Sequence, residues 1–183
     1  MKDYFNKLKV NSPRSLLDYF EKYMQYGFTF RNKKFTDLQP NFQENMNKLY
    51  KIRLGKDFIK SGYGVCWDFC ELERDFFEIY NIEHVCYFIE SYINRAEGGP
   101  THTFAIFKQN DKWCWFEYSW LYYRGIWEYN SKEEALNDIL KKFEKFYDRK
   151  LINIRIYKTQ KVTKRLNAYE FVEHCVNGEQ VEF

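Results

Sequence analysis

Two segments rich in aromatic and β-branched residues lie on either side of a short polar turn in the second half of the chain. Residues 101–107 and 112–119 have the composition of β-strands, and Gln109 and Asn110 occupy the turn predicted between them. Strands joined by so short a turn must pair antiparallel. A turn centred between these two residues places His102 directly opposite Glu117, with the two side chains on one face of the sheet. An off-centre turn at Asn110 and Asp111 would break this pairing.

The remaining segments predict an α+β domain. Ser12, Ser131 and Asn167 are suited to cap helices. Helices are predicted over 13–26, 40–52, 66–80, 132–147 and 168–177, with short extended pieces at 28–31 and 34–35 and further strands over 82–93 and 151–157. This order of helices followed by mostly antiparallel strands favours an α+β fold.

Length and composition suit one compact domain covering residues 1–183. Of the 183 residues, 45% are hydrophobic and 30% are charged, which argues against a disordered chain. The cysteines number five, the N-terminal residues form no apolar leader, and no apolar run approaches the roughly 18 residues that a membrane span needs. We therefore expect a cytoplasmic protein with free thiols and no membrane partner.

Charge is unevenly distributed although the net charge is only +3. Residues 66–90 hold seven acids and one arginine, whereas residues 141–165 hold ten lysines and arginines and two acids. The basic segment is either a solvated helix face followed by a strand or a nucleic-acid surface. It shows no RRM, KH or zinc-finger pattern, so no nucleic-acid partner is expected.

Cys66 follows the turn at 62–65, which contains two glycines, and it opens the helix predicted over 66–80. Glycine lets the backbone turn sharply and lets a ligand approach closely. The N-terminus of a helix carries a partial positive charge and unpaired N–H groups, which stabilise a thiolate and can bind an oxyanion. Most single cysteines are structural, but this position makes Cys66 a candidate nucleophile.

The pair formed by His102 and Glu117 has two interpretations. Alternation along the strands places Phe104 and Trp115 on the same face, so the pair sits at the end of an otherwise apolar surface. It is either a buried structural pair or a general base and its orienting acid. A glutamate beside a histidine holds the ring, fixes its tautomer and stabilises the imidazolium.

Three segments resemble the transglutaminase-like superfamily of cysteine enzymes: GVCWDFCELE at 64–73, THTFAIF at 101–107 and KWCWFEYSW at 112–120. The superfamily carries a Gly-x-Cys-x-Asp block at a helix start, a histidine on a strand and an acid on the next strand. The resemblance covers about residues 60–130 and is nearest to small stand-alone bacterial proteins of this type. It implies a papain-like fold, in which a helix bearing the cysteine packs on an antiparallel sheet.

The resemblance also implies roles for individual residues. Cys66 matches the nucleophile, His102 the general base and Glu117 the acid, although the superfamily usually has aspartate at the last position. Asp68 matches the aspartate of the first block, and we expect it to stabilise the helix start. Because the superfamily includes crosslinking enzymes, peptidases, amidases and inactive members, the resemblance names no substrate.

We therefore expect a cysteine enzyme that acts on the amide bonds of a peptide or protein through a thioester. Hydrolysis is favoured over transfer to an amine because water is always available. The alternatives are a protein-glutamine acyltransferase and a binding module on the same fold whose triad is idle. No P-loop, dinucleotide fingerprint or calcium-loop spacing is present, so we expect no cofactor and no metal. The oligomeric state is left open.

Aromatic residues crowd around the candidate site in the sequence. Core packing or a substrate groove explains them, and the candidates for substrate binding are Tyr63, Trp67, Trp115 and Trp120. The second oxyanion donor, beside the Cys66 backbone N–H, is predicted to be Gln39, Gln43 or Tyr63.

The other cysteines and histidines have weaker functional interpretations. Cys70, four residues after Cys66, is a candidate resolving thiol, or a zinc ligand together with His174 and Cys175, although no second cysteine pair follows at zinc spacing. Packing is the simpler interpretation of Cys86 and Cys114, and a surface or packing role that of His84 and His174.

Overall fold

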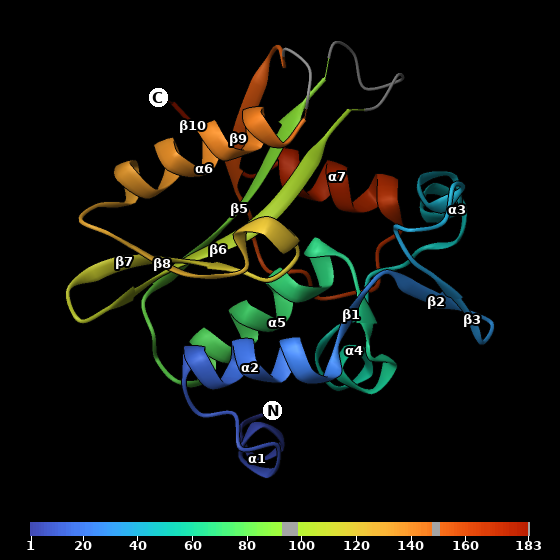
Figure 1. The fold of residues 1–183 in the computed structure, drawn as a ribbon, viewed down its shortest axis with the longest axis horizontal. Coiled ribbons are helices and arrows are strands. Elements are labelled where there is room, and N and C mark those ends of the chain that lie inside the picture. Colours follow the sequence, from blue (N-terminus) through green and yellow to red (C-terminus); the bar gives the residue numbers. More distant parts are fainter. Residues whose placement is uncertain (93–98, 148–150, 183) are drawn as a thin grey trace.

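The computed structural model describes residues 1–92, 99–147 and 151–182 (Figure 1). Its centre is a six-stranded antiparallel sheet with the strand order β10–β9–β5–β6–β7–β8. The strands are β5 (His84–Ser91), β6 (Thr101–Gln109), β7 (Lys112–Glu117), β8 (Gly125–Tyr129), β9 (Ile154–Lys158) and β10 (Glu179–Val181). The α+β class with an antiparallel sheet is thereby confirmed.

The helices surround this sheet. They are α1 (Lys2–Lys7), α2 (Pro13–Tyr23), α3 (Phe42–Leu49), α4 (Gly55–Ser61), α5 (Cys66–Ile79), α6 (Lys132–Phe146) and α7 (Ala168–Val176), with a short 3-10 helix, η1 (Leu121–Tyr123). Two small ladders complete the fold: β1 (Gln25–Tyr26) pairs parallel with β4 (Tyr63–Gly64), and β2 (Phe28–Phe30) pairs antiparallel with β3 (Lys33–Phe35). The sequence did not predict α1, α4, β1, β4, β8, β10 or η1, and the helix predicted over 13–26 ends at Tyr23, so that β1 follows where helix was expected.

The predicted helix caps are present. The Ser12 and Ser131 hydroxyls and the Asn167 amide oxygen each accept the backbone N–H three residues ahead, as N-caps do. At Asn167 the Glu170 carboxylate in turn accepts the Asn167 N–H, which completes the capping box. At Ser131 the corresponding carboxylate of Glu134 accepts the Asn130 N–H instead, so the capping box is only half formed there.

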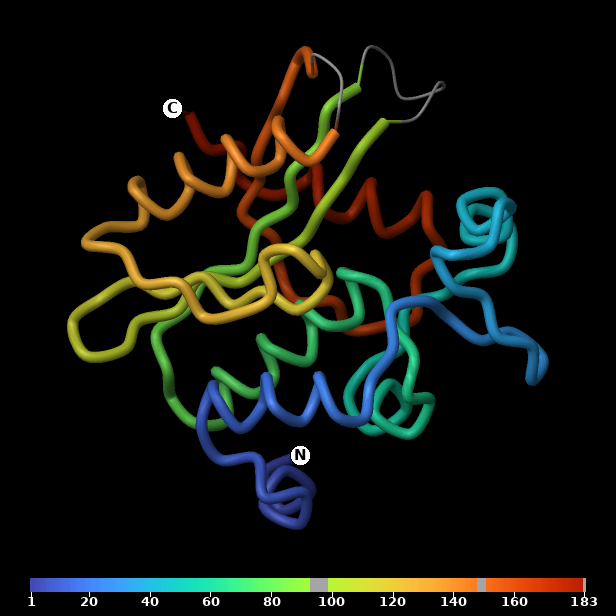
Figure 2. The backbone as a smooth tube through the Cα atoms, viewed as in Figure 1, coloured from blue at the N-terminus to red at the C-terminus, as the bar shows by residue number. Residues whose placement is uncertain are grey.

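Helix α5 lies on one face of the sheet, and α6 covers the other (Figure 1). Buried side chains of α5, such as Phe69 and Phe77, join those of β6 and β7 and of the outer helix α2 in one apolar cluster. Phe104 and Trp115, on the opposite face, pack with buried side chains of α6. The backbone trace therefore runs in four layers, with α5 held between the sheet and α2 (Figure 2).

The β6–β7 hairpin differs from the prediction in its turn. Asn110 and Asp111 occupy the turn, with φ of 50° and 61°, and such positive values suit a two-residue hairpin turn. The ladder begins at Gln109 opposite Lys112 and ends at Ala105 opposite Phe116. The pairing is thus displaced by two residues from the prediction, and His102 is not directly opposite Glu117.

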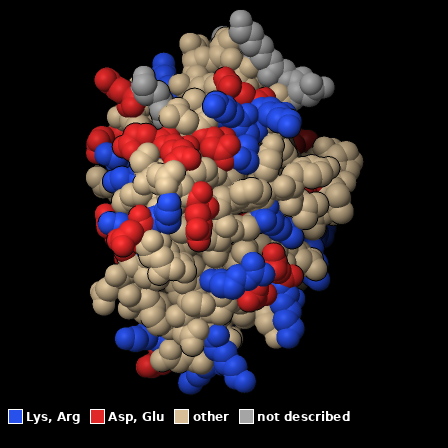
Figure 3. Space-filling view, turned by 60° about the vertical axis from the view of Figure 1, so that its left-hand side comes forward, with Lys and Arg blue, Asp and Glu red and all other residues tan. Residues whose placement is uncertain are grey.

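The basic segment pairs in part with acids elsewhere in the fold. Lys161 contacts Asp75 at 2.6 Å and Glu78 at 2.5 Å, both on the acidic helix α5. One face of the molecule shows acidic and basic side chains interspersed (Figure 3). None of the helices within the described ranges combines the length and apolar character that crossing a bilayer requires.

Candidate active site

Cys66 is the first residue of α5, as the sequence predicted. The turn before it needs glycine at position 64, because a Cβ there would lie 2.3 Å from the Phe58 ring. Gly62 ends α4 in the left-handed region at φ 67°. The first N–H groups of a helix have no partner within it, so the Cys66 N–H, at the first position of α5, has no acceptor inside this helix.

Asp68 holds this helix start. Its carboxylate accepts the backbone N–H groups of Val65 at 2.8 Å and Arg53 at 2.7 Å, and the Tyr50 hydroxyl at 2.9 Å. Burial raises the pKa of Asp68 to about 6, against the opposing effect of these hydrogen bonds. All these partners belong to the local scaffold, which agrees with a role in stabilising the helix start.

His102 and Glu117 form a buried hydrogen-bonded pair. The distance from His102 Nε2 to Glu117 Oε2 is 2.7 Å, and each side chain is 2% exposed. The displacement of the hairpin by an even number of residues keeps both side chains on one face, and the length of the glutamate lets it span the diagonal. The contact that the sequence predicted is therefore present, by a different register.

Trp120 contacts both members of this pair. Its ring stacks on the His102 imidazole, with centroids 3.9 Å apart and planes 10° from parallel. Its backbone N–H donates to Glu117 Oε1 at 2.8 Å, so both carboxylate oxygens are held. Trp120 was expected to bind substrate; its ring, 6% exposed, instead packs on the histidine.

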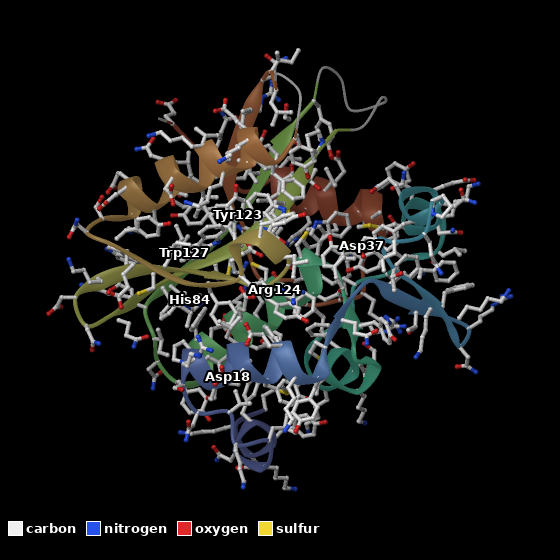
Figure 4. The ribbon with its side chains drawn as sticks, viewed as in Figure 1. Asp18, Asp37, His84, Tyr123, Arg124 and Trp127 are labelled. Atoms are coloured by element: carbon white, nitrogen blue, oxygen red, sulfur yellow. The ribbon has the colours of Figure 1, made fainter. Side chains whose placement is uncertain are left out.

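The segment after Trp120 is tied back to the fold. Tyr123 and Trp127 lie close together beside Arg124 (Figure 4), and Trp127 Nε1 donates to the Tyr123 carbonyl at 2.8 Å. Arg124 Nε donates to the Tyr118 carbonyl at 2.6 Å. These bonds anchor the chain on both sides of the turn that carries Trp120.

The other side of the imidazole contacts Cys66. Burial lowers the pKa of His102, but the Glu117 charge and hydrogen bonds to Cys66 and Glu117 more than offset this and raise it to about 9. The ring is therefore an imidazolium at neutral pH. Since Nε2 is bonded to Glu117, Nδ1 is the nitrogen left for the Cys66 sulfur. The structure thus brings Cys66, His102 and Glu117 together in that order.

Tyr26, in β1, also contacts the thiol, and sequence reasoning missed it. Burial, the Cys66 charge and a hydrogen bond to Cys66 hold the pKa of Tyr26 well above its ordinary value, so the phenol stays protonated. The ladder between β1 and β4 places Tyr26 beside Gly64, two residues before the cysteine. A two-residue strand 40 positions upstream of Cys66 has no periodic signal that could have revealed it.

A cavity of about 740 Å³ opens beside Cys66. Trp67 lines it, as expected, whereas Tyr63 is not among the described lining residues. Trp115 is fully buried in the cluster beneath α6, so its assignment to a substrate groove is wrong. Of the oxyanion candidates, Gln43 lines the cavity, while Gln39 does not and instead accepts the Thr36 N–H at 3.3 Å.

The remaining cysteines are buried, and all five thiols are free. Cys70 hydrogen-bonds Cys86 of β5. Cys114 belongs to the core cluster around α5, and Cys175 to a second cluster that contains Trp67 and Phe171. The described residues contain no group of three or more His, Cys, Asp or Glu side chains arranged to hold a metal ion.

The other two histidines bond backbone carbonyls. His84 Nδ1 lies 2.9 Å from the Ile82 oxygen, at the start of β5 (Figure 4), and His174 Nε2 lies 2.9 Å from the Gln160 oxygen. These contacts agree with surface or packing roles.

A scan against protein-family models finds no match for this chain, and a search of the curated proteins finds no matching relative. The likeness to the transglutaminase-like superfamily therefore stays a prediction based on the three sequence segments.

Proposed function

We propose that this chain is a transglutaminase-like cysteine enzyme that hydrolyses an amide bond in a peptide or protein. Cys66 is the nucleophile, His102 the general base and Glu117 the acid that orients it. One observation carries the proposal: the His102 ring, hydrogen-bonded to the buried Glu117 carboxylate, also interacts with the Cys66 thiol, which lies at a helix start beside a cavity.

Acylation uses the groups at the helix start. The Cys66 thiolate attacks the carbonyl carbon, and the carbonyl oxygen becomes an oxyanion that accepts the Cys66 N–H and the Tyr26 hydroxyl. The C–N bond then breaks, and the departing amine takes the proton that His102 Nδ1 holds. Glu117 stabilises the imidazolium until that proton leaves. The products of this step are a thioester on Cys66 and a free amine.

Deacylation reverses the role of His102. The neutral imidazole takes a proton from water, the resulting hydroxide attacks the thioester, and the C–S bond breaks to release a carboxylic acid and the thiolate. An amine in place of water would give acyl transfer, which is the alternative reaction at the same site. Apart from the attacking water, these steps use side-chain and backbone groups of the chain.

The arrangement of α5 and the sheet supports a papain-like core. A helix that begins with the cysteine packs on an antiparallel sheet, and neighbouring strands of that sheet supply the histidine and the acid. This is the arrangement that the resemblance implies.

A second candidate is a binding module whose triad is idle. The observation that favours it is burial, because Cys66 is 5% exposed and His102 is 2% exposed. A substrate carbonyl must reach the sulfur through the cavity, so a thiol that no reagent reaches would support this candidate.

A covalent intermediate tests the proposal. Wild-type protein is mixed with a panel of N-acetylated peptide 4-nitroanilides, quenched in acid and weighed intact by mass spectrometry. We expect an acyl adduct on Cys66 and release of nitroaniline with at least one peptide. Cys66→Ala should show neither and should unfold at nearly the wild-type temperature. A wild type that forms no adduct with any peptide, or an equally active Cys66→Ala, contradicts the proposal.

A further inference from the structure

The cavity beside Cys66 is a groove with walls formed by α3 and α7, and it is also lined by Tyr92, Pro100 and Thr101, where β5 ends and β6 begins. Figure 1 shows both helices near the N-terminal end of α5. Phe42 and Met46, one turn apart on α3, line the groove, as do Ala168 and Val172, one turn apart on α7. All four side chains belong to the apolar cluster that contains Cys66 and Trp67. The groove therefore has an apolar row on each wall.

A polar row lies beside each apolar row. On α3, Gln43 Nε2 donates to Asn47 Oδ1 at 3.1 Å, which leaves the Gln43 carbonyl oxygen and the Asn47 N–H groups for another partner. Tyr169 and Glu173 occupy the matching positions on α7, and both residues are exposed. An amide oxygen and amide N–H groups at a groove edge match the N–H and C=O groups of an extended peptide backbone.

The position of His102 indicates which part of the substrate lies in this groove. The leaving amine takes its proton from His102, so it must lie on the His102 side of the sulfur. Cys66 lines the groove, whereas the 2% exposed His102 is not among the described lining residues. Pro100 and Thr101, which directly precede His102, also line the cavity and mark its leaving-group end, so the acyl group lies against the walls formed by α3 and α7.

We propose that this groove binds the acyl part of the substrate as a short extended peptide and selects an uncharged, apolar side chain at the residue whose carbonyl is attacked. This inference rests on the proposed function, because it takes Cys66 as the attacking atom. The nine residues of α7 extend about 13 Å. That length accommodates about four residues of extended chain. The cavity volume of about 740 Å³ falls in the usual range for bound ligands.

The selectivity follows from the burial of the side chain between the two apolar rows. An apolar side chain gains free energy on leaving water, whereas a carboxylate loses its hydration among Phe42, Met46 and Val172. One methylene group more or less in an apolar pocket gives discrimination of about 10- to 200-fold. We expect at least about a tenfold preference for phenylalanine over aspartate.

Binding to Cys66→Ala measures this preference without any reaction. The probes are N-acetyl-Ala-Phe-amide and N-acetyl-Ala-Asp-amide, titrated by isothermal calorimetry into the folded variant. The expected result is that the phenylalanine amide binds at least about tenfold more tightly. Equal affinities, a preference for aspartate, or binding of neither amide overturns the inference.

A lysine placed on the α7 wall should change the preference. Val172→Lys, in the Cys66→Ala background, puts a cation in the apolar row and should raise the affinity for the aspartate amide relative to the phenylalanine amide by about tenfold or more. Tyr169→Lys, at a 68% exposed position on the rim, should act in the same direction and is safe for folding. Asn137→Lys is the matched control, because it adds the same charge to an exposed position on α6, a helix that covers the other face of the sheet. An unchanged preference in both groove variants, or an equal change in the control, overturns the inference.

The two proposals fail in different ways. A wild type that forms no thioester while Cys66→Ala still discriminates between the amides refutes the enzyme and leaves a peptide-binding groove. A wild type that forms thioesters equally well with apolar and acidic acyl residues refutes the selectivity and leaves the enzyme.

Discussion

The pKa of His102 gives a quantitative test of the role of Glu117. The difference between the ordinary value of 6.5 and the value of about 9 corresponds to roughly 3 kcal/mol. In Glu117→Gln the shape is kept and the charge is lost, while burial still lowers the pKa and Cys66 still raises it. We therefore expect the His102 pKa to fall from about 9 toward 6.5 in this variant.

The same shift makes folding stability depend on pH. Because the folded-state pKa lies above the ordinary value, the protonated ring stabilises the fold fully below about pH 6.5, and this contribution is lost as the pH rises to about 9. The wild type should lose up to about 3 kcal/mol of unfolding free energy over that window through His102. Glu117→Gln should lack this loss, and urea denaturation at several pH values measures the difference.

Nitrogen-detected NMR titration measures the pKa of His102 directly. The chain has three histidines, so the His102 signals are assigned by their absence in His102→Gln, and His84 and His174 serve as internal controls. Catalytic turnover in Glu117→Gln should fall by a factor on the order of 10³–10⁴. A wild-type His102 that titrates near 6.5, or a pKa that stays near 9 in Glu117→Gln, would refute the reasoning.

Two further substitutions test the residues that surround the triad. Tyr26→Phe removes the hydroxyl beside the sulfur and should lower kcat by about 10²–10³ with little change in the melting temperature; unchanged turnover would remove Tyr26 from the oxyanion site. Trp120→Ala removes the ring stacked on His102 and should cost about 3–5 kcal/mol of unfolding free energy as well as lower kcat, whereas Trp120→Phe should retain most of both. Equal behaviour of the alanine and phenylalanine variants, by urea denaturation and steady-state kinetics, would show that the stacked ring does not position the histidine.

The sequence predicted elements whose signals are local. The side chains of Ser12 and Asn167 accept backbone N–H groups that have no partner within their helices, so these residue types mark the helix starts. Helix α5 was predictable because it has no glycine or proline between its first and last residues. The β6–β7 hairpin shows which features of strand pairing the local sequence predicts. Alternation assigned His102 and Glu117 to the correct face, but the register depended on the left-handed backbone of Asn110 and Asp111, which the composition of the turn left open.

Features set by distant contacts were missed. Tyr26 reaches the thiol only because β1 pairs with β4, and two residues are too few for a periodic pattern. Alternation placed Trp115 on the His102 face but did not reveal that α6 covers it there. The start of α4 was missed because Leu54 precedes it in place of a capping side chain, and its first residue, Gly55, has low helix propensity.

Selective alkylation of Cys66 tests most directly the central claim that His102 and the helix start activate this thiol. The protein is treated with iodoacetamide at pH 6.5 under native conditions, and the labelling of all five cysteines is followed by peptide mass spectrometry. The account predicts that Cys66 reacts much faster than the buried Cys70, Cys86, Cys114 and Cys175, and that His102→Ala slows it toward their rate while the fold persists. Labelling of Cys66 no faster than that of the other four cysteines, or an unchanged rate in His102→Ala, would contradict the account.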